Sequence, residues 1–269
     1  MKKLLTVAGS DSSGGAGIQA DLKTFAALGA YGMSCVASLT AQNTTGVTMV
    51  VNTPPEMVKA QLEAVFADIP PDAVKTGMLS TPAITETVAD FFSAHSDVPL
   101  VVDPVMVATT GAVLLEKEAI ETYKTRLIPE AAVITPNIPE AQVLSGMEIK
   151  NEEDMKAAAK EISKLGCRAV LVKGGHSVCD ATDILWDGTD IFDFREKKIE
   201  TENTHGTGCT LSSAIAVYLA EGKTAAEAVF AAKRYLTGAL RSAKIRKVGH
   251  GNGPVDHFWF YGDRWGQLS

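Results

Sequence analysis

The sequence predicts an α/β fold with a central, mostly parallel sheet, helices on both faces and a short antiparallel edge. Short apolar runs alternate with longer amphipathic segments, which is the pattern of strand–helix–strand units in a parallel sheet. The Asp183–Thr201 segment breaks this alternation with two β-rich runs around Asp187-Gly188, a hairpin signal. With 269 residues, 46% of them hydrophobic, the chain is long enough for one large domain over residues 1–269.

The predicted elements follow one another without a repeat or a linker that would divide the chain. Strands are expected at Leu4–Ala8, Ser34–Leu39, Ala73–Lys75, Leu100–Val102, Val133–Thr135 and Ala169–Val172. Helices are expected at Ile18–Leu28, Pro55–Phe66, Ile84–Phe92, Lys117–Leu127, Glu153–Leu165, Leu211–Ala220 and Ala225–Lys244. Gly29 and Gly166 follow two of these helices, where glycine commonly ends a helix. A third short β run is expected after the hairpin.

Composition argues against several classes of function. The net charge is −7 and no Lys/Arg cluster stands out, so the basic stripe that a nucleic-acid partner needs is missing. The opening MKKLLTVAGSD turns polar within about ten residues, too soon for a signal peptide or a membrane span, so we expect a cytoplasmic protein. The histidines form no metal-ligand pattern. No CxxC pair occurs, and the cysteines are expected to be reduced thiols: Cys35, Cys167, Cys179 and Cys209.

A glycine-rich loop, Gly9–Gly17, lies between the first predicted strand and the first predicted helix. Glycines in this position let backbone N–H groups approach an anionic ligand at a helix N-terminus. The loop lacks the end of a Walker A motif, and the spacing of Gly9 and Gly14 does not fit a dinucleotide fingerprint. A tight strand–helix turn without a ligand explains the glycines equally well.

A second glycine signal, Gly222-Lys223-Thr224, resembles the end of a Walker A loop. Val217 stands where that loop needs its first glycine, and a helix precedes the triplet instead of a strand. We therefore expect a helix stop at Gly222, followed by a capping box of Thr224 and Glu227.

The segment Asn203–Thr210, with the sequence NTHGTGCT, precedes a strongly apolar helix. Gly206 and Gly208 just ahead of that helix expose N–H groups at the positive end of its dipole. Such a turn suits a phosphoryl group in transfer, whose charge spreads over its oxygens. The same dipole is expected to lower the pKa of the Cys209 thiol. An ordinary glycine-rich cap with a buried cysteine is the competing interpretation.

Polar residues follow three of the predicted strands, and ligands of open α/β sheets bind at such strand ends. Asp103 ends one strand, and Lys173 ends another, where it can meet a phosphate or simply face solvent. After the third, Asn137 is expected to be a helix N-cap with Glu140 as its N3 partner. Together with the two glycine segments, these strand ends predict an enzyme that transfers a phosphoryl group from ATP to a small molecule.

Taken together, the segments resemble the ribokinase-like superfamily, and within it the hydroxymethylpyrimidine and phosphomethylpyrimidine kinase branch. The matching pieces are AGSDSSGGAGIQADLKTF, SLTAQNT, KTGML, DPVM, ITPNIPEA, KGGH, NTHGTGCT and GHGNGP, spread from Ala8 to Pro254. The resemblance implies ATP with Mg²⁺, frequent homodimers, and two reactions of thiamine biosynthesis. The first phosphorylates 4-amino-5-hydroxymethyl-2-methylpyrimidine, and the second converts the monophosphate to the diphosphate.

The resemblance also implies which residues bind the pyrimidine. Gln42 matches the residue whose amide binds the ring, and an amide offers the donor and the acceptor that a ring nitrogen beside an amine requires. Gly9, Ala16, Met78 and Val105 match positions that line the pocket. For Gln42 the alternative is a loop amide in water, and for Met78 and Val105 it is plain core.

The catalytic residues implied by the resemblance lie at the other strand ends. Gly206, Thr207, Gly208 and Cys209 match the anion hole, and sugar kinases of the superfamily typically carry an aspartate base in place of Cys209. Asp103 and Glu140 match positions that help to organise Mg²⁺, and Lys173 matches a lysine on the phosphate side.

Three other functions compete with this one. A pyridoxal or pyridoxine kinase has the same fold, but AQNTTGV and NTHGTGC favour the pyrimidine enzyme. A catalytically silent ligand-binding relative would be expected to lose some of the residues of the anion hole and its neighbours. An NAD-dependent oxidoreductase is disfavoured by the glycine spacing.

Overall fold

The computed structural model describes residues 1–106, 117–175 and 180–261. The strands are β1 Lys3–Gly9, β2 Tyr31–Asn43, β3 Gly46–Asn52, β4 Ala73–Thr76, β5 Leu100–Val102, β6 Val133–Ile134, β7 Val170–Val172, β8 Asp180–Trp186 and β9 Ile191–Lys197. The α-helices are α1 Gly17–Ala27, α2 Pro55–Asp68, α3 Pro82–Ser93, α4 Lys117–Thr122, α5 Ile138–Ser145, α6 Glu152–Ser163, α7 Thr207–Ala220 and α8 Ala225–Ala243. A π-helical turn, Tyr123–Leu127, and two 3₁₀ turns, Ile128–Glu130 and Trp259–Tyr261, complete the described elements.

Within the described residues, nine strands form one sheet in the order β3-β2-β1-β4-β5-β6-β7-β8-β9. The six strands from β2 to β7 pair in parallel, and β3, β8 and β9 are antiparallel to their neighbours. The order reverses at β1, because β2 lies on one side of it and β4 on the other. The carboxyl ends of β1 and β4 therefore flank the switch point, where open α/β sheets form a ligand crevice.

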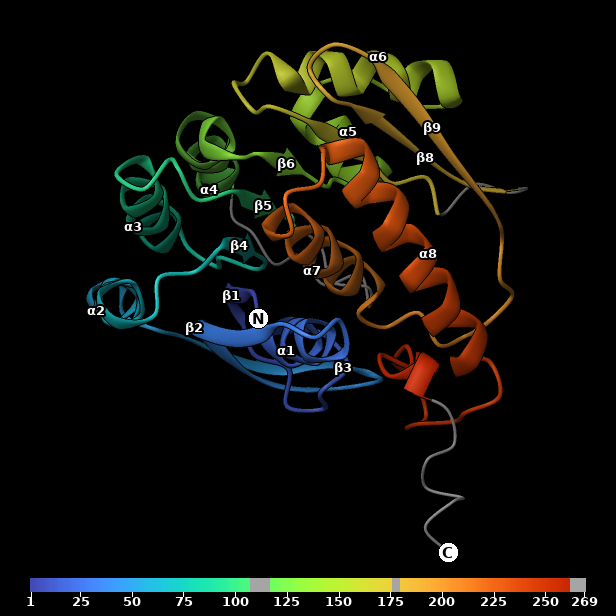
Figure 1. Cartoon of the computed structure of the whole chain (residues 1–269), viewed down its shortest axis with the longest axis horizontal. Coiled ribbons are helices and arrows are strands. Elements are labelled where there is room, and N and C mark those ends of the chain that lie inside the picture. The colour runs from blue at the N-terminus through green and yellow to red at the C-terminus, as the bar shows by residue number, and fades with distance from the viewer. Residues whose placement is uncertain (107–116, 176–179, 262–269) are drawn as a thin grey trace, which may run out of the picture.

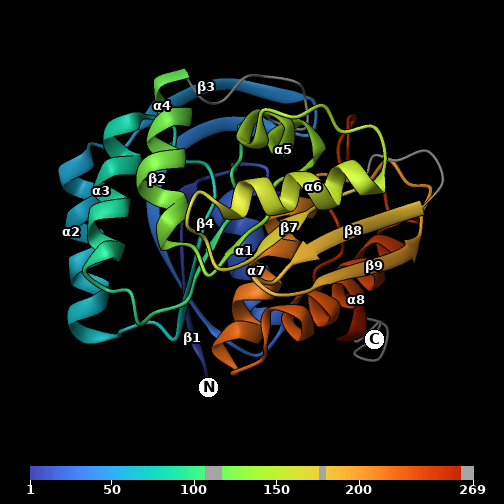
Figure 2. The same cartoon turned by 90° about the horizontal axis from the view of Figure 1, so that it is seen from above.

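Helices cover both faces of the sheet (Figures 1 and 2). Leu4 and Val101 face one apolar cluster, which α1, α7 and α8 complete with buried residues such as Phe25 and Ile215. The neighbouring residue Leu5 faces the opposite cluster, formed with α2, α3, α5 and α6. Because side chains alternate along a strand, a run that is buried on both faces is apolar throughout, as the sequence of β1 is.

The mostly parallel sheet, the helices on both faces and the β8–β9 hairpin confirm the predicted fold class. One prediction was incomplete, because a second antiparallel edge exists where β2 continues to Asn43 and turns into β3. The residues of β3 are exposed or only partly buried. Val47, Met49 and Val51 do alternate along the segment, but none of them is buried, and the strand forms by pairing with the extended end of β2. The expected third β run is also wrong, since residues 198–203 form no strand.

Several helices begin and end at the capping residues and glycines that the sequence predicts. Capping boxes at Asn137/Glu140 and Thr224/Glu227 are both formed, and Gly222 has a positive φ of 89° after α7, which confirms the helix stop. The predicted helix Lys117–Leu127 instead changes from α4 to a π-helical turn at Tyr123. Among the described residues, no helix is long and apolar enough to cross a membrane.

The cysteines Cys35, Cys167 and Cys209 carry free thiols, while Cys179 lies outside the described residues.

Candidate active site

The predicted polar strand ends meet the N-terminus of α7 at the carboxyl edge of the sheet. Asp103 follows β5 and Lys173 follows β7, and the Lys173 Nζ lies 2.9 Å from the Asp103 Oδ1. A methyl group added at Gly208, in the first turn of α7, would lie 3.4 Å from that ammonium and 3.5 Å from the Asp103 Oδ2. The anion-hole turn, the lysine and the aspartate therefore form one site, although they are far apart in the sequence.

Asp103 is almost completely buried and is held by several donors. The hydroxyl of Thr135, after β6, donates to its Oδ1 at 3.1 Å, and the hydroxyl of Ser212, on α7, lies 3.3 Å from its Oδ2. Burial by itself would raise the pKa of Asp103, but the positive charges of Lys173 and Lys75 outweigh it and lower that pKa. Asp103 is thus an anion at neutral pH. Lys173 is only 15% exposed, which rules out a solvated strand end.

Glu140 combines a structural contact with an unusual charge state. Its Oε2 accepts the backbone N–H of Asn137 at 2.8 Å, and its Oε1 lies 3.4 Å from the backbone nitrogen of Met106. Burial raises the pKa of Glu140 to about 7; Lys173 opposes this rise and Asp103 adds to it. Such a carboxyl group is about half ionised near neutral pH, and a nearby cation would stabilise its ionised form.

The anion-hole turn has the backbone geometry that the sequence predicts. Gly206 is the N-cap of α7 with a left-handed φ of 78°, and a Cβ at this position would overlap the carbonyl oxygen of Gly15. The N–H of Thr207 bonds to Thr204, while those of Gly208 and Cys209 find no backbone carbonyl among the described residues. These two donors, at the positive end of the helix dipole, are available to an anion.

The expected lowering of the Cys209 pKa is wrong. Burial raises the pKa of its thiol to about 11, the positive charge of Lys75 lowers it, and the carboxylates Asp21 and Asp103 raise it. The helix dipole therefore does not decide the charge of this thiol, because the loss of water around it and the two nearby carboxylates favour the neutral form.

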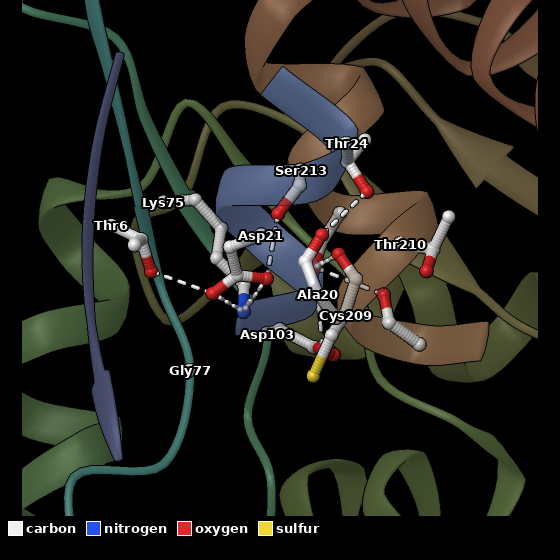
Figure 3. A network of polar contacts seen from close by, with 12 residues as sticks. Thr6, Ala20, Asp21, Thr24, Lys75, Gly77, Asp103, Cys209, Thr210 and Ser213 are labelled. Atoms are coloured by element: carbon white, nitrogen blue, oxygen red, sulfur yellow. Dashed lines mark hydrogen bonds and ion pairs between the residues drawn. The ribbon is translucent and has the colours of Figure 1, made fainter. Parts of the chain in front are cut away.

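A buried ion pair lies beneath the site and was missed from the sequence (Figure 3). Lys75 on β4 bonds both carboxylate oxygens of Asp21 on α1 at 2.9 Å, and neither side chain is exposed. The hydroxyls of Thr6 on β1 and Ser213 on α7 donate to the same carboxylate at 2.6 and 2.7 Å. Burial by itself would lower the pKa of Lys75, but Asp21 outweighs it and raises that pKa, so the lysine is charged. The available signal was a lysine directly after Ala73 and Val74 in a short strand that is buried throughout.

The expected pyrimidine pocket is assembled only in part by direct contacts. A methyl group at Gly9 would lie 2.5 Å from the Met78 Cε, so these two positions face each other. Gln42 lies at a bulge in the pairing of β2 with β3, and its backbone exchanges hydrogen bonds with the Ser12 hydroxyl at 2.7 and 2.8 Å. Ala16 is the N-cap of α1. Val105 is half-buried beside Asp103, to whose carbonyl its N–H donates at 2.8 Å.

The N–H groups of the Gly9–Gly17 loop bind an anion from within the chain. The Asp11 carboxylate accepts the backbone N–H groups of Ser13, Gly15 and Ala16 at 2.8–3.0 Å. The Asp11 Oδ2, which accepts the N–H groups of Gly15 and Ala16, also lies 2.8 Å from the His205 Nε2. Of the two interpretations of the glycine loop, these bonds favour the tight turn for the N–H groups of Ser13, Gly15 and Ala16, because Asp11 already accepts them.

Comparison with known proteins assigns the family. The sequence model of the phosphomethylpyrimidine kinase family matches residues 11–256. The chain belongs to this family. A hydroxymethylpyrimidine/phosphomethylpyrimidine kinase of Streptomyces coelicolor is 49% identical over 260 residues, which cover 97% of this chain and 96% of that protein. The thiamine biosynthesis bifunctional protein ThiED of Geobacter sulfurreducens is 52% identical over 94% of this chain, which spans about half (52%) of that longer protein.

A solved structure shows the same fold. The ADP complex of Bacillus subtilis pyridoxal kinase has a TM-score of 0.90 and 39% identity, and the match covers 98% of this kinase and 100% of that chain. The kinase therefore has the ribokinase-like fold that the resemblance implied.

The buried pair makes a direct prediction about stability. Replacing the lysine in Lys75→Met leaves the Asp21 carboxylate buried without its cation, which should lower the free energy of unfolding by about 3–5 kcal/mol. Urea denaturation followed by circular dichroism measures this change. The control is Lys59→Met, which removes an exposed pair with Glu63 (62% and 58% exposed) and should cost under about 1 kcal/mol. Equal losses in the two variants would show that the buried pair contributes no more than a surface pair.

Proposed function

We propose that this kinase phosphorylates 4-amino-5-hydroxymethyl-2-methylpyrimidine with ATP and then phosphorylates the monophosphate to the diphosphate. The observation that carries the proposal is the meeting of the free N–H groups of the α7 turn with Lys173 and Asp103. A phosphoryl group in transfer needs donors and a positive charge that are already in place, because its charge spreads over several oxygens.

Each group at this edge of the sheet then has a role. The turn Gly206–Cys209, which includes Thr207, surrounds the transferring phosphoryl group, with the N–H groups of Gly208 and Cys209 as its donors. The Lys173 ammonium neutralises part of its charge. Gln42 reads the ring of the pyrimidine by hydrogen bonds, while Gly9, Ala16, Met78 and Val105 line the pocket. Because the ring and the phosphoryl group are bound by different segments, transfer depends on how those segments are placed relative to each other.

The charged residues of the site also fit a magnesium ion. Mg²⁺ prefers oxygen ligands and is usually bound through one or two carboxylates, waters and substrate phosphates. Asp103 and Glu140 supply two carboxylates, and the described residues contain no group of three acidic, histidine or cysteine side chains that would form a protein-only cage. The raised pKa of Glu140, about 7, marks a carboxyl group that a cation would stabilise in its charged form. Bound there, the ion would neutralise phosphate charge.

Pyridoxal is the second candidate acceptor, because the Bacillus subtilis pyridoxal kinase has the same fold. Its ring also carries a hydroxymethyl group. The pyrimidine is preferred because the relatives with higher identity over the full length carry the pyrimidine kinase name.

The kinase is further proposed to be a cytoplasmic homodimer. The β2–β3 hairpin leaves several large apolar side chains exposed, and a second copy of the chain would cover them. These residues are Leu39, Met49, Val50 and Val51. The free thiols at positions 35, 167 and 209 suit a reducing compartment.

The proposed function predicts the outcome of a substrate comparison. ATP consumption should depend on hydroxymethylpyrimidine and form first the monophosphate and then the diphosphate. Assays of the purified kinase with the pyrimidine, its monophosphate and pyridoxal in parallel measure this dependence. If ATP is consumed with pyridoxal, and with neither pyrimidine above background, the assignment changes to a pyridoxal kinase.

Removal of the Gln42 amide should weaken the use of the pyrimidine. In Gln42→Leu the buried ring loses a polar partner worth about 1–3 kcal/mol, which is about 10- to 100-fold in kcat/KM. The matched control is Gln61→Leu, which removes an amide that bonds the Val36 backbone in β2. That variant should lose stability while the pyrimidine KM stays unchanged. An unchanged kcat/KM in Gln42→Leu would show that Gln42 does not read the ring.

Cys209, in its thiolate form, is proposed to accept the proton of the first acceptor. In the first reaction the acceptor is an alcohol, which must lose a proton, and base catalysis of such steps is worth about 10²–10⁴-fold. In the second reaction the acceptor is a phosphate that is already ionised near neutral pH, because its second pKa is about 6. A base can therefore assist only the first step.

Replacement of the thiol should separate the two steps. Cys209→Ala keeps the backbone of the anion hole and should slow the first phosphorylation much more than the second. Because the thiol pKa is about 11, the thiolate fraction grows with pH, so the wild-type first-step rate should rise between about pH 7 and 9. That slope should disappear in the variant. Each rate is measured from its own substrate, and equal losses in the two steps would leave Cys209 as part of the anion-hole backbone alone.

A further inference from the structure

A hydrogen bond between two buried side chains joins the Gly9–Gly17 loop to the anion-hole turn. The His205 Nε2 lies 2.8 Å from the Asp11 Oδ2, and the two side chains are 7% and 1% exposed. Asp11 belongs to the loop expected to line the acceptor pocket, and His205 immediately precedes Gly206 of the anion hole. We infer that Asp11 and His205 are a positioning pair, which fixes the acceptor loop relative to the anion hole. This inference rests on the proposed function.

The carboxylate of Asp11 holds its own loop in shape. Its Oδ2 accepts the N–H groups of Gly15 and Ala16, and its Oδ1 accepts the N–H and the hydroxyl of Ser13. Burial by itself would raise the pKa of Asp11, but the bonds from His205, Ser13 and Ala16 outweigh it and hold that pKa well below its usual range. An ionised carboxylate only accepts hydrogen bonds, so the His205 Nε2 must carry the proton.

Backbone contacts show that the two segments are packed directly against each other. A Cβ at Gly206 would overlap the Gly15 carbonyl oxygen, and a Cβ at Gly15 would overlap the His205 ring. The backbone N–H of Gly17, at the start of α1, is also close enough to the Cys209 thiol to lower its pKa. Glycine at positions 15 and 206 thus permits a close approach, and the Asp11–His205 bond sets its geometry.

The GHGNGP segment, residues 249–254, has no role in the proposed function, and it contacts the backbone of His205. The His205 N–H donates to the Gly253 carbonyl at 3.0 Å, and Pro254 bridges to His205. The Gly251 N–H lies 3.2 Å from the hydroxyl of Thr44, in the turn between β2 and β3, two residues beyond Gln42. His205 therefore stands where the acceptor loop, the Gln42 hairpin and the anion hole meet.

The consequence concerns the distance between the acceptor oxygen and the transferring phosphoryl group. The acceptor is bound by the Gly9–Gly17 loop and Gln42, and the phosphoryl group is bound by the Gly206–Cys209 turn. Neither Asp11 nor His205 needs to touch the reacting atoms, so their loss should lower kcat in both phosphorylation steps while the KM values change little. A misplacement of about 1 Å costs about 100-fold in rate. Cys209→Ala, by contrast, should lower the rate of the first phosphorylation much more than that of the second.

Two substitutions at one position test the inference. The amide nitrogen of Gln can take the place of the imidazole Nε2, whereas that of the shorter Asn takes the place of Nδ1 and cannot reach Asp11. His205→Asn should therefore lower kcat about 100-fold in both steps, and His205→Gln should recover most of that loss. Rates of both steps, KM values and melting temperatures are measured for the two variants and the wild type. A purely structural role would lower the melting temperature of His205→Asn and leave kcat unchanged, which overturns the inference, as would equal rates in the two variants.

Two further measurements keep the test independent of folding and of the substrate assignment. If His205→Asn does not fold, Asp11→Asn replaces it, because an amide offers one acceptor oxygen where the carboxylate offers two; an unchanged kcat would again overturn the inference. Hydrogen exchange of the Thr207 and Thr210 amides, which donate to the carbonyls of Thr204 and Gly206, reports the coupling without turnover. It should quicken in His205→Asn but not in His205→Gln. If the wild-type protein turns over ATP with none of the acceptors, the proposed function is contradicted. If the amide exchange rates of His205→Asn and His205→Gln are equal, the positioning pair is contradicted.

Discussion

The ion pair of Lys75 and Asp21 joins the two strands and two helices on which the site depends. Asp21 lies on α1, Lys75 on β4, and the hydroxyls that complete the carboxylate's hydrogen bonds come from β1 and α7. Removing two charges from water costs several kcal/mol each unless geometry and hydrogen bonds compensate. Because both oxygens of the carboxylate are bonded, this arrangement of the four elements satisfies both charges. That arrangement places the N-terminus of α7 opposite the ends of β1 and β4.

The same principle recurs twice at the carboxyl edge of the sheet. Asp103 pairs with Lys173 and links β5 to β7, and Asp11 pairs with His205 and links the loop after β1 to the turn before α7. In each case a buried carboxylate takes its partner from a segment distant in the sequence. Loops that carry binding groups gain precision when such bonds fix them to regular elements. The site is therefore held by buried carboxylates and their hydrogen-bond donors, in addition to the apolar packing of the two faces.

Electrostatics at the site depend on the balance between burial and neighbouring charges. Cys209 stands at a helix N-terminus, yet burial and the carboxylates of Asp21 and Asp103 raise the pKa of its thiol to about 11. Burial also raises the pKa of Glu140 to about 7, whereas the positive charges of Lys173 and Lys75 outweigh burial and lower the pKa of Asp103. Within one site, two pKa values are thus raised and one is lowered, which no single local rule describes.

The sequence by itself determined the elements with strong local signals. The apolar strands, the capping boxes at Asn137 and Thr224 and the stop at Gly222 follow from bonds between residues a few positions apart. The polar strand ends Asp103 and Lys173 could also be placed together, because parallel strands end at one edge. Only the tertiary structure decided the β3 edge, the role of Asp11, the Lys75–Asp21 pair and the charge of Cys209. Each depends on burial or on a partner distant in the chain, Asp11 on His205 above all, and neither quantity is written in a local pattern.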